Sequence, residues 1–537
     1  MIPLTSIKQL AIVQDTAYFF EDAGQPPPQQ SSNKIFPGAE SRDEQGGFHA
    51  MSYLRYFAAV CFSLAFINVA ARAQQKTDRL TPMDMFNIQY VADPQISPDG
   101  HKIVYVRRFN DVMTDKGYSN LWIIDFDGGG NRPLTTGNYS DNSPLWSPDG
   151  TRIIFVSNRD GKPQIYLRWM DTGQTAKITN LEFSPSGIAW SPDGKSVAFV
   201  SMTPTAPPKV GTMPAAPAGA KWEPPARVYD SLIYRFNGIG YLPHASEQLF
   251  VIPADGGTPH QLTSGDHPFG GIGGFSQPQP VWTPDGKYIV TSANRRPDYE
   301  YEPLDSDIYQ FSVEDGSVKA LTARHGPDNS PAISPDGQHI AYTGFDEHFL
   351  GYEVNHLYVM NRDGSGSHQL ATSLDRDIQE PTWASDGSGL YFVYDDQGDT
   401  KLGFCTLDGS VKTLADHLGS GGSAYGGGAA FTIARNGNFA VTRTSPSDPG
   451  NIFVGTIGNS STRIITNVNE GLFAQRKLGQ VEEIWYNSSV DQRKVEGWII
   501  KPPDFDPSKK YPFIIEIHGG PFADYGDRFD IEKQMMA

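Results

Sequence analysis

A four-residue turn that recurs about every fifty residues is the feature that most limits how this chain can fold. Five copies read Ser/Thr-Pro-Asp-Gly and two are degenerate, and the seven begin at residues 97, 147, 191, 283, 334, 384 and 434. Their Asp or Asn positions are separated by 50, 44, 92, 51, 50 and 50 residues. A repeat of this length indicates a series of similar supersecondary units, each packed on its neighbours.

Each copy has the chemistry of a tight turn between two strands. Type I turns favour Ser at the first position, Pro at the second and Gly at the fourth. A bulky residue such as Trp146 precedes most copies, and an alternating strand such as residues 153–156 follows. Most units then contain a second hairpin, so each unit predicts four short antiparallel strands, the content of one propeller blade. Seven units predict a mainly β protein with a seven-bladed β-propeller over residues 77–470.

The 92-residue interval is interpreted as an insertion at about residues 203–244, without an eighth blade. Residues 203–225 are rich in Pro and Ala and predict an exposed, extended loop. Arg235 and Tyr241 belong to the aromatic and arginine cluster that follows. Two interpretations remain open: the cluster lines a binding cavity, or it packs the insertion onto its own blade.

Residues 51–73 have the pattern of a secretory signal peptide. Arg55 supplies a positive charge, and the apolar run over residues 57–70 is short for a membrane span. Cleavage is predicted after Ala73, which predicts a periplasmic or secreted protein with no stable membrane anchor once the signal is removed. A core helix is the alternative. The polar residues 1–50 are expected to be disordered or to arise from a start site placed too far upstream.

The composition excludes several classes of partner and site. A net charge of −18 and an isoelectric point near 5.1 argue against nucleic acid, because phosphate binding needs a basic face. Removal of Cys61 with the signal leaves Cys405, and one thiol cannot form an intrachain disulfide. No Cys/His cluster has zinc spacing, so no metal site is predicted. Cys405 lies in an apparent strand and is expected to be buried and inert.

The pattern changes after residue 470. Residues 483–486, 495–500 and 513–517 predict three strands, and the last is almost continuously apolar, which is typical of a strand covered on both faces. His518-Gly519-Gly520-Pro521 follows the third strand directly. A strand followed by His-Gly-Gly is how an α/β-hydrolase presents part of its oxyanion hole. On its own, the motif predicts only a turn at a strand end.

A propeller with these turns, followed by Gly-Trp-Ile-Ile-Lys-Pro-Pro at residues 497–503 and then by His-Gly-Gly-Pro, resembles the prolyl oligopeptidase family of serine peptidases. The similarity is greatest to its acylaminoacyl-peptidase and dipeptidyl-peptidase V branch. The resemblance implies that residues 471–537 are the first part of an α/β-hydrolase domain. It also implies that the Gly520 N–H is an oxyanion donor and that Gly519 shapes the loop. His518 is not the base, since the catalytic histidine of a hydrolase follows the nucleophile and the acid in the chain.

The resemblance implies a serine exopeptidase that cleaves short peptides through an acyl-enzyme, with the propeller restricting access and without a cofactor. Arg235 and Tyr241 are then candidate substrate contacts. No Gly-x-Ser-x-Gly motif follows residue 521, so the chain is expected to be a fragment without the catalytic triad and inactive alone. The family includes dimers and larger assemblies, and a homo-oligomer is left open. The alternative is a non-catalytic periplasmic propeller scaffold of the TolB type.

Overall fold

The computed structural model describes residues 11–12 and 78–537, except 210, 213, 224–225, 270–277, 351, 420–424, 460 and 520–522. The chain divides into two compact units, one of Met1–Leu80 with Asp506–Gly519 and the other of Thr81–Phe505 with Gly520–Ala537. The predicted signal peptide lies outside the described residues. Within the described part, no helix has the length and apolar character needed to cross a membrane.

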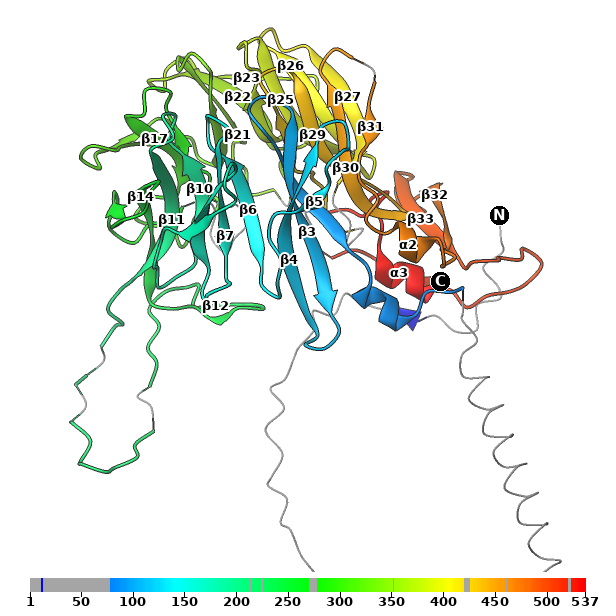
Figure 1. Cartoon of the computed structure of the whole chain (residues 1–537), viewed down its shortest axis with the longest axis horizontal. Helices are drawn as coiled ribbons and strands as arrows, with labels where there is room; N and C mark the ends of the chain where they lie inside the picture. Colours follow the sequence, from blue (N-terminus) through cyan, green and yellow to red (C-terminus); the bar gives the residue numbers. More distant parts are fainter. Residues whose placement is uncertain are drawn as a thin grey trace, which may run out of the picture. The chain divides into compact units, whose positions relative to one another are not determined.

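Short antiparallel sheets follow one another through the larger unit (Figure 1). The first five in chain order, named sheets 1 to 5, have four strands each. Sheet 1 contains β2 (Tyr90–Ile96), β3 (Lys102–Asp111), β4 (Lys116–Asp125) and β5 (Arg132–Pro133); sheet 2 contains β6 (Asp141–Trp146), β7 (Arg152–Ser157), β8 (Gln164–Trp169) and β9 (Thr175–Lys177). Sheet 3 contains β10 (Ser186–Trp190), β11 (Ser196–Pro204), β14 (Ala245–Pro253) and β15 (His260–Gln261). Sheet 4 contains β16 (Val281–Trp282), β17 (Tyr288–Ala293), β18 (Asp307–Ser312) and β19 (Val318–Ala320); sheet 5 contains β20 (Asp328–Ile333), β21 (His339–Gly344), β22 (His356–Asn361) and β23 (His368–Leu370).

Sheet 6 has eight strands and completes the propeller-like domain. It contains β24 (Gln379–Trp383), β25 (Gly389–Asp396), β26 (Asp399–Thr406), β27 (Val411–Leu418), β28 (Phe431–Ile433), β29 (Asn438–Ser445), β30 (Asp448–Thr456) and β31 (Arg463–Ile464). The register joins β27 to β29 through a single residue pair, Leu418 with Arg443. Division at this pair would give two further four-stranded blades. The count of seven blades stays a prediction.

The inserted segment lies between β11 and β14, which pair directly along nine residues from Ser196↔Pro253 to Pro204↔Ala245. Within it, β12 (Arg235–Phe236) and β13 (Gly240–Tyr241) form a separate two-stranded hairpin. Most of residues 205–223 are exposed. A loop here does not disturb the sheet, because it leaves from one end of a fully paired hairpin.

The repeated turn has the expected geometry. In its first copy, Ser97 Oγ donates to Asp99 Oδ1 at 2.5 Å and accepts the Lys102 N–H at 2.9 Å. The Gly100 N–H closes the turn on Ser97 O at 2.8 Å, and Gly100 has φ of 75°, a conformation in which a Cβ would be strained. The hydroxyl and the carboxylate therefore satisfy backbone donors that the turn would otherwise leave unpaired.

The tryptophans that precede the turns link neighbouring sheets. Trp146 Nε1 in β6 donates to Gln95 O in β2 at 2.9 Å, and Trp190 Nε1 donates to Leu145 O at 3.2 Å. The same contact joins Trp282 to Ala189 O and Trp383 to Ala332 O. A large ring with one donor suits this place, because its body packs between two sheets while its N–H satisfies a backbone carbonyl.

Side-chain contacts, and not a shared strand, join sheet 6 back to sheet 1 in the described residues. Thr432 Oγ1 accepts the Ile96 N–H at 2.9 Å and donates to Pro94 O at 2.9 Å. Asn436 and Asn438 donate to the backbone of the first turn at 3.1 Å each. A buried apolar cluster from both sheets lies beneath, and it includes Val91, Ile103, Tyr105, Ala440, Ile452 and Val454. Burial of this cluster supplies the main driving force for closure.

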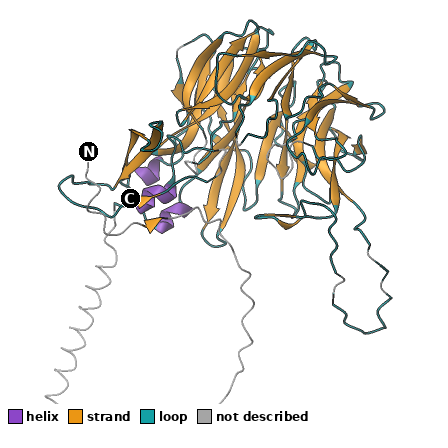
Figure 2. Ribbon diagram, turned by 180° about the vertical axis from the view of Figure 1, so that it is seen from behind, coloured by secondary structure: helices purple, strands orange, loops and turns teal. Residues whose placement is uncertain are grey.

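The larger unit also contains three short helices, which Figure 2 shows close to one another. They are η2 (Pro82–Phe86), α2 (Glu470–Phe473) and α3 (Ile531–Met536). The predicted strands near residues 483 and 495 are confirmed as the hairpin of β32 (Gln480–Asn487) and β33 (Lys494–Lys501). This hairpin and residues 523–537 belong to the same compact unit as the propeller. The predicted domain boundary at residue 471 stays a prediction.

The C-terminal residues lie against sheet 6. The Asp527 N–H donates to Gly398 O at 2.9 Å, and the Gly426 N–H donates to Asp524 O at 3.0 Å. Gly398 has φ of 66°, and a Cβ there would meet Trp498 Cζ2 at 2.5 Å, so the β32–β33 hairpin packs closely on this turn. Phe529 is completely buried. The tail ends in the short helix α3.

The smaller unit contains β34 (Ile514–Ile515), which pairs in parallel with β1 (Ala11–Ile12). The prediction of a strand over residues 513–517 that is covered on both faces is wrong. Ile514 is 44% exposed and Ile517 is 70% exposed. Within the described residues of this unit, β34 has only β1 as a strand neighbour, so no second layer covers its apolar side chains.

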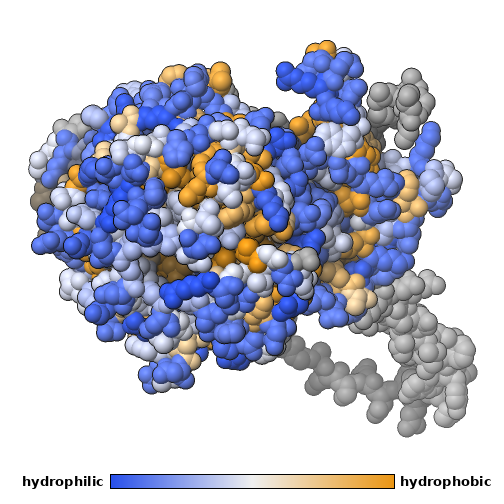
Figure 3. Space-filling model, turned by 90° about the horizontal axis from the view of Figure 1, so that it is seen from above, coloured by the Kyte–Doolittle hydropathy of each residue, from blue (hydrophilic) through white to orange (hydrophobic). Residues whose placement is uncertain are grey.

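Cys405 is fully buried in β26, and burial raises the pKa of its thiol. A thiol with a raised pKa is a poor nucleophile, as expected for this residue. Figure 3 shows one face of the molecule, on which hydrophilic side chains predominate and hydrophobic ones are interspersed.

Candidate functional site

The His-Gly-Gly-Pro loop is described only in part. His518 and Gly519 are exposed, and His518 Nδ1 lies 2.9 Å from Gly519 O. Gly520 and Pro521 lie outside the described residues. The role of Gly520 as an oxyanion donor and that of Gly519 in shaping the loop therefore stay predictions from the sequence.

The structure brings Arg235 and Tyr241 together. They are register partners across the β12–β13 hairpin, and both are exposed. Tyr241 stacks on Tyr229 with a centroid distance of 5.4 Å, and the Arg227 guanidinium lies 5.8 Å from the Tyr241 ring. The hairpin therefore presents a small platform of aromatic rings and arginines to solvent, a surface on which a peptide could stack.

One contact also supports the alternative interpretation of this insertion. The Leu232 N–H donates to Glu300 Oε1 at 3.1 Å, which ties the insertion to the segment between β17 and β18. The insertion thus contacts sheet 4 as well as presenting aromatic side chains. Both interpretations of the cluster remain compatible with the structure.

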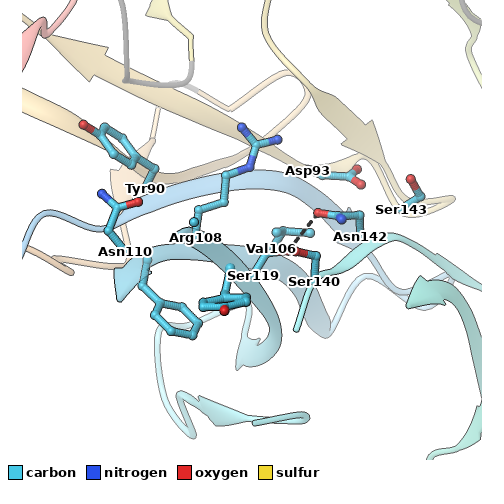
Figure 4. A pocket seen from close by; sticks show the side chains of 12 residues that line it. Tyr90, Asp93, Val106, Arg108, Asn110, Ser119, Ser140, Asn142 and Ser143 are labelled. Atoms are coloured by element: carbon cyan, nitrogen blue, oxygen red, sulfur yellow. Dashed lines mark hydrogen bonds between the residues drawn. The ribbon is translucent and has the colours of Figure 1, made fainter. Parts of the chain in front are cut away.

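A polar pocket of about 470 Å³ lies between sheets 1 and 2, and the sequence analysis did not identify it (Figure 4). It is lined by Tyr90, Asp93, Val106, Arg108, Phe109, Asn110, Gly117, Tyr118, Ser119, Ser140, Asn142 and Ser143. Val106, Arg108 and Asn110 alternate along β3 and so share one face of the sheet. Tyr90 lies directly opposite Arg108 in the β2–β3 register.

Backbone irregularities place polar side chains in this pocket. The β2–β3 register shifts between Ala92 and Gln95, and Asp93 within the shift has φ of 47°. Ser143 occupies the corresponding shift of β6 with φ of 52°. Such a bulge redirects the side chain of one residue away from the ladder.

A sequence signal for these positions existed. Asp93 and Ser143 each precede a proline three residues before the turn begins, and Ser330 and Glu380 do the same in sheets 5 and 6. All four have φ between 47° and 52°. A repeated residue-proline pair at one point of each unit marks an interrupted strand, and it could have been used to predict the residues at the bulges.

The pocket carries both signs of charge. Burial raises the pKa of Asp93, although hydrogen bonding from Gln95 Nε2 at 2.6 Å and the charge of Arg108 oppose the increase. Glu380, at the bulge of β24, has its pKa raised to about 7 by burial and by the charge of Asp93. Burial, with a contribution from Asp530, raises the pKa of Tyr90 to about 12, so its hydroxyl stays protonated at neutral pH.

The pocket borders the segments that flank the propeller. Asn110 Nδ2 donates to Met85 O of η2 at 2.8 Å. Asp530, whose charge acts on Tyr90, is the residue that caps α3. The pocket is therefore on the side of the propeller where the N-terminal helix and the C-terminal segment attach.

One group of side chains has ligand atoms close enough for a metal. Asp399, Asp416 and His417 place one such atom each within 4.8 Å of the others. His417 Nδ1 also lies 3.5 Å from Asp399 Oδ1 and 3.6 Å from Asp527 Oδ2. Ion pairing accounts for this arrangement, and we assign no metal to it.

Known proteins with similar sequences are peptidases. A family model described as the TolB beta propeller domain matches residues 77–215. Dipeptidyl-peptidase 5 of Porphyromonas gingivalis is 26% identical over 456 residues, which cover 83% of this chain and 64% of that protein. The uncharacterized peptidase YuxL of Bacillus subtilis is 27% identical over 482 residues, which cover 85% of this chain and 69% of that protein. The chain thus spans about two thirds of the length of these relatives.

The fold is also that of a solved peptidase. The acylaminoacyl peptidase of Pyrococcus horikoshii superposes with a TM-score of 0.63 over 84% of this chain and 64% of its own, at 19% sequence identity. The matched share of the chain exceeds the part that the family model covers. These similarities, the propeller-like domain and the hairpin that follows it support the resemblance to the prolyl oligopeptidase family of peptidases.

Proposed function

We propose that this protein is a serine exopeptidase that releases dipeptides or acyl-amino acids from short peptides. The observation that carries the proposal is the similarity to dipeptidyl-peptidase 5, which extends over 83% of the chain and includes the segment after the propeller. The His-Gly-Gly-Pro sequence supports it, because acyl transfer needs a preorganised donor where negative charge develops on the carbonyl oxygen. No cofactor takes part in this chemistry.

In the proposed reaction, a serine attacks the peptide carbonyl, a histidine transfers the protons, and an aspartate orients the histidine. From this chain, the Gly520 N–H would stabilise the tetrahedral oxyanion. Arg235 and Tyr241 would contact the peptide from the β12–β13 hairpin. The propeller would restrict access to short substrates. The exposure of the hairpin and its aromatic neighbours support the proposed contact.

The test is hydrolysis of dipeptidyl and N-acetyl-amino-acid p-nitroanilides by the full-length gene product. We expect release of nitroaniline from at least one class. Gly520→Pro removes the donor N–H and should lower kcat by a factor on the order of 10²–10³, whereas Gly211→Pro, in the exposed insertion loop, should leave kcat unchanged. A folded protein that hydrolyses neither class would contradict the proposal and favour the scaffold alternative.

We also propose that the protein is exported to the periplasm or secreted, on the support of the signal-like sequence over residues 51–73. The mature chain should then begin at Gln74. N-terminal sequencing of the protein recovered from the producing cells tests this, and a mature chain that retains residues 51–73 would contradict it.

A further inference from the structure

Arg108 is the exposed cation of the pocket between sheets 1 and 2. It forms no hydrogen bond or ion pair with another side chain in the described part of the chain, although Asp93 is close enough to interact with its charge. In Figure 4 its side chain extends between Tyr90 and Asp93. A guanidinium has five N–H donors to satisfy. Water or a ligand must therefore satisfy the donors of Arg108.

Most polar groups around Arg108 are neutral hydroxyls and amides, which can both donate and accept hydrogen bonds, and Asp93 is the carboxylate in the lining. The Tyr90 hydroxyl faces the same side of the sheet and stays protonated. The hydroxyls of Ser140 and Ser143 line the opposite wall. Ser119 Oγ lies 3.0 Å from both Asp141 O and Asn142 Oδ1, which fixes that wall to sheet 1. A cation surrounded by fixed neutral donors is an arrangement that binds an anion.

Asp93 does not neutralise this cation fully. Gln95 holds one of its carboxylate oxygens, and the two charged groups do not form an ion pair. Its burial favours the uncharged form. A bound carboxylate would therefore meet a guanidinium to which Asp93 is not hydrogen-bonded.

A planar carboxylate is an anion that suits the guanidinium of this pocket. A guanidinium matches a carboxylate with two parallel hydrogen bonds, and it does so in a protein whose net charge of −18 repels carboxylates elsewhere. The volume of about 470 Å³ accommodates the end of a short peptide and not a folded chain. A short peptide carries a free C-terminal carboxylate at an end small enough for a pocket of this volume.

We infer that this pocket binds the C-terminal carboxylate of a short peptide, with Arg108 as the residue that recognises it. The inference rests on the proposed peptidase function for the identity of the ligand. It goes beyond that function because it explains the proposed preference for short substrates by a residue in sheet 1 of the propeller. Arg108 is a specificity residue in this assignment and not a catalytic one.

The test compares binding of trialanine as the free acid and as the C-terminal amide to the full chain, by NMR titration of the peptide. The wild-type chain should bind the acid about tenfold more tightly, which is the gain expected from charge-assisted hydrogen bonds. Arg108→Gln should remove this difference, and Arg108→Lys should restore part of it. Arg132→Gln is the matched control, because Arg132 lies in β5 of the same sheet, is exposed and does not line the pocket.

Equal affinity for acid and amide in the wild-type chain would overturn the inference, and so would equal effects of the Arg108 and Arg132 substitutions or no binding of either peptide. Unchanged melting curves show that each variant is folded. If Arg108→Gln does not fold, Arg108→Lys still tests the inference. The p-nitroanilide reporters have no free carboxylate. Their hydrolysis therefore tests the peptidase proposal independently of this subsite.

Discussion

Replacing Asp84 with alanine is expected to lower the free energy of unfolding of the larger unit by about 3–5 kcal/mol. Asp84 is 2% exposed, and it accepts hydrogen bonds from Arg476 Nε at 2.8 Å and Arg476 Nη2 at 3.0 Å. Thr81 adds its N–H at 2.8 Å and its hydroxyl at 2.9 Å. This carboxylate joins η2, before the propeller, to the segment that follows α2. Its removal leaves the Arg476 charge in a largely buried place without this partner.

Urea unfolding followed by circular dichroism measures the effect. Asp255→Ala is the control, because Asp255 is 87% exposed and lies 3.8 Å from Arg152, so the midpoint should not change. A midpoint for Asp84→Ala equal to that of the control would contradict the prediction. Asp84→Asn should be intermediate, since it keeps the shape and removes the charge.

The contribution of Asp84 should also depend on pH. Burial alone would raise the pKa of Asp84, but hydrogen bonds from Arg476 and Thr81 outweigh it and lower the pKa below its ordinary value. The stabilisation is therefore complete above the pKa of the unfolded chain and is lost as the pH falls through the lower pKa of the folded chain. The difference between the wild-type chain and Asp84→Asn should decrease over that acidic range.

The sequence predicts the propeller well because the same turn motif recurs in several units. The Ser97 and Asp99 contacts are within one turn, and a local pattern suffices to anticipate them. The tryptophan before a turn was recognised as bulky and apolar, but its bond to the preceding sheet joins residues such as Trp146 and Gln95, 51 positions apart. No local sequence pattern identifies a hydrogen-bond partner that lies so far away in the chain.

The functional residues were harder to predict for a related physical reason. Arg235 and Tyr241 attract attention because they lie in an aromatic cluster, and the structure does place them side by side. Arg108 lies within a strand and has no sequence feature that separates it from Arg107. What separates them is the face of the strand, since Arg107 lies 4.3 Å from the Trp122 ring while Arg108 lines the pocket. The bulge at Asp93 and the face of β3 that carries Arg108 are defined only by the folded sheet.

The second large predicted effect is a loss of stability in the C-terminal segment, residues 523–537. The contacts of this segment determine whether the loss affects the segment alone or the propeller as well. Phe529 is fully buried, and its ring centroid lies 5.7 Å from that of Phe473, the last residue of α2. Arg528 beside it is also buried and donates to Asp395 Oδ1 at 3.2 Å and Thr400 Oγ1 at 2.9 Å. Substituting a buried phenylalanine with alanine typically costs about 3–5 kcal/mol. Phe529 does not belong to the buried apolar clusters that join neighbouring sheets, such as those of sheets 5 and 6 and of sheets 1 and 2, so this cost should fall on the docking of the segment and not on the propeller.

Phe529→Ala should therefore increase hydrogen exchange in residues 523–537 by a factor of at least about 10², as the local opening free energy falls by about 3 kcal/mol or more. The Asp527 amide, bonded to Gly398 O, and the Gly426 amide, bonded to Asp524 O, report on the docking directly. Amides of β3 and β4 in sheet 1 should keep their protection. Met536→Ala is the control, because Met536 is 43% exposed and should change exchange little. Equal loss of protection in sheet 1 would instead mean that the segment and the propeller unfold as one cooperative unit, and unchanged exchange at Asp527 would mean that Phe529 does not hold the segment in place.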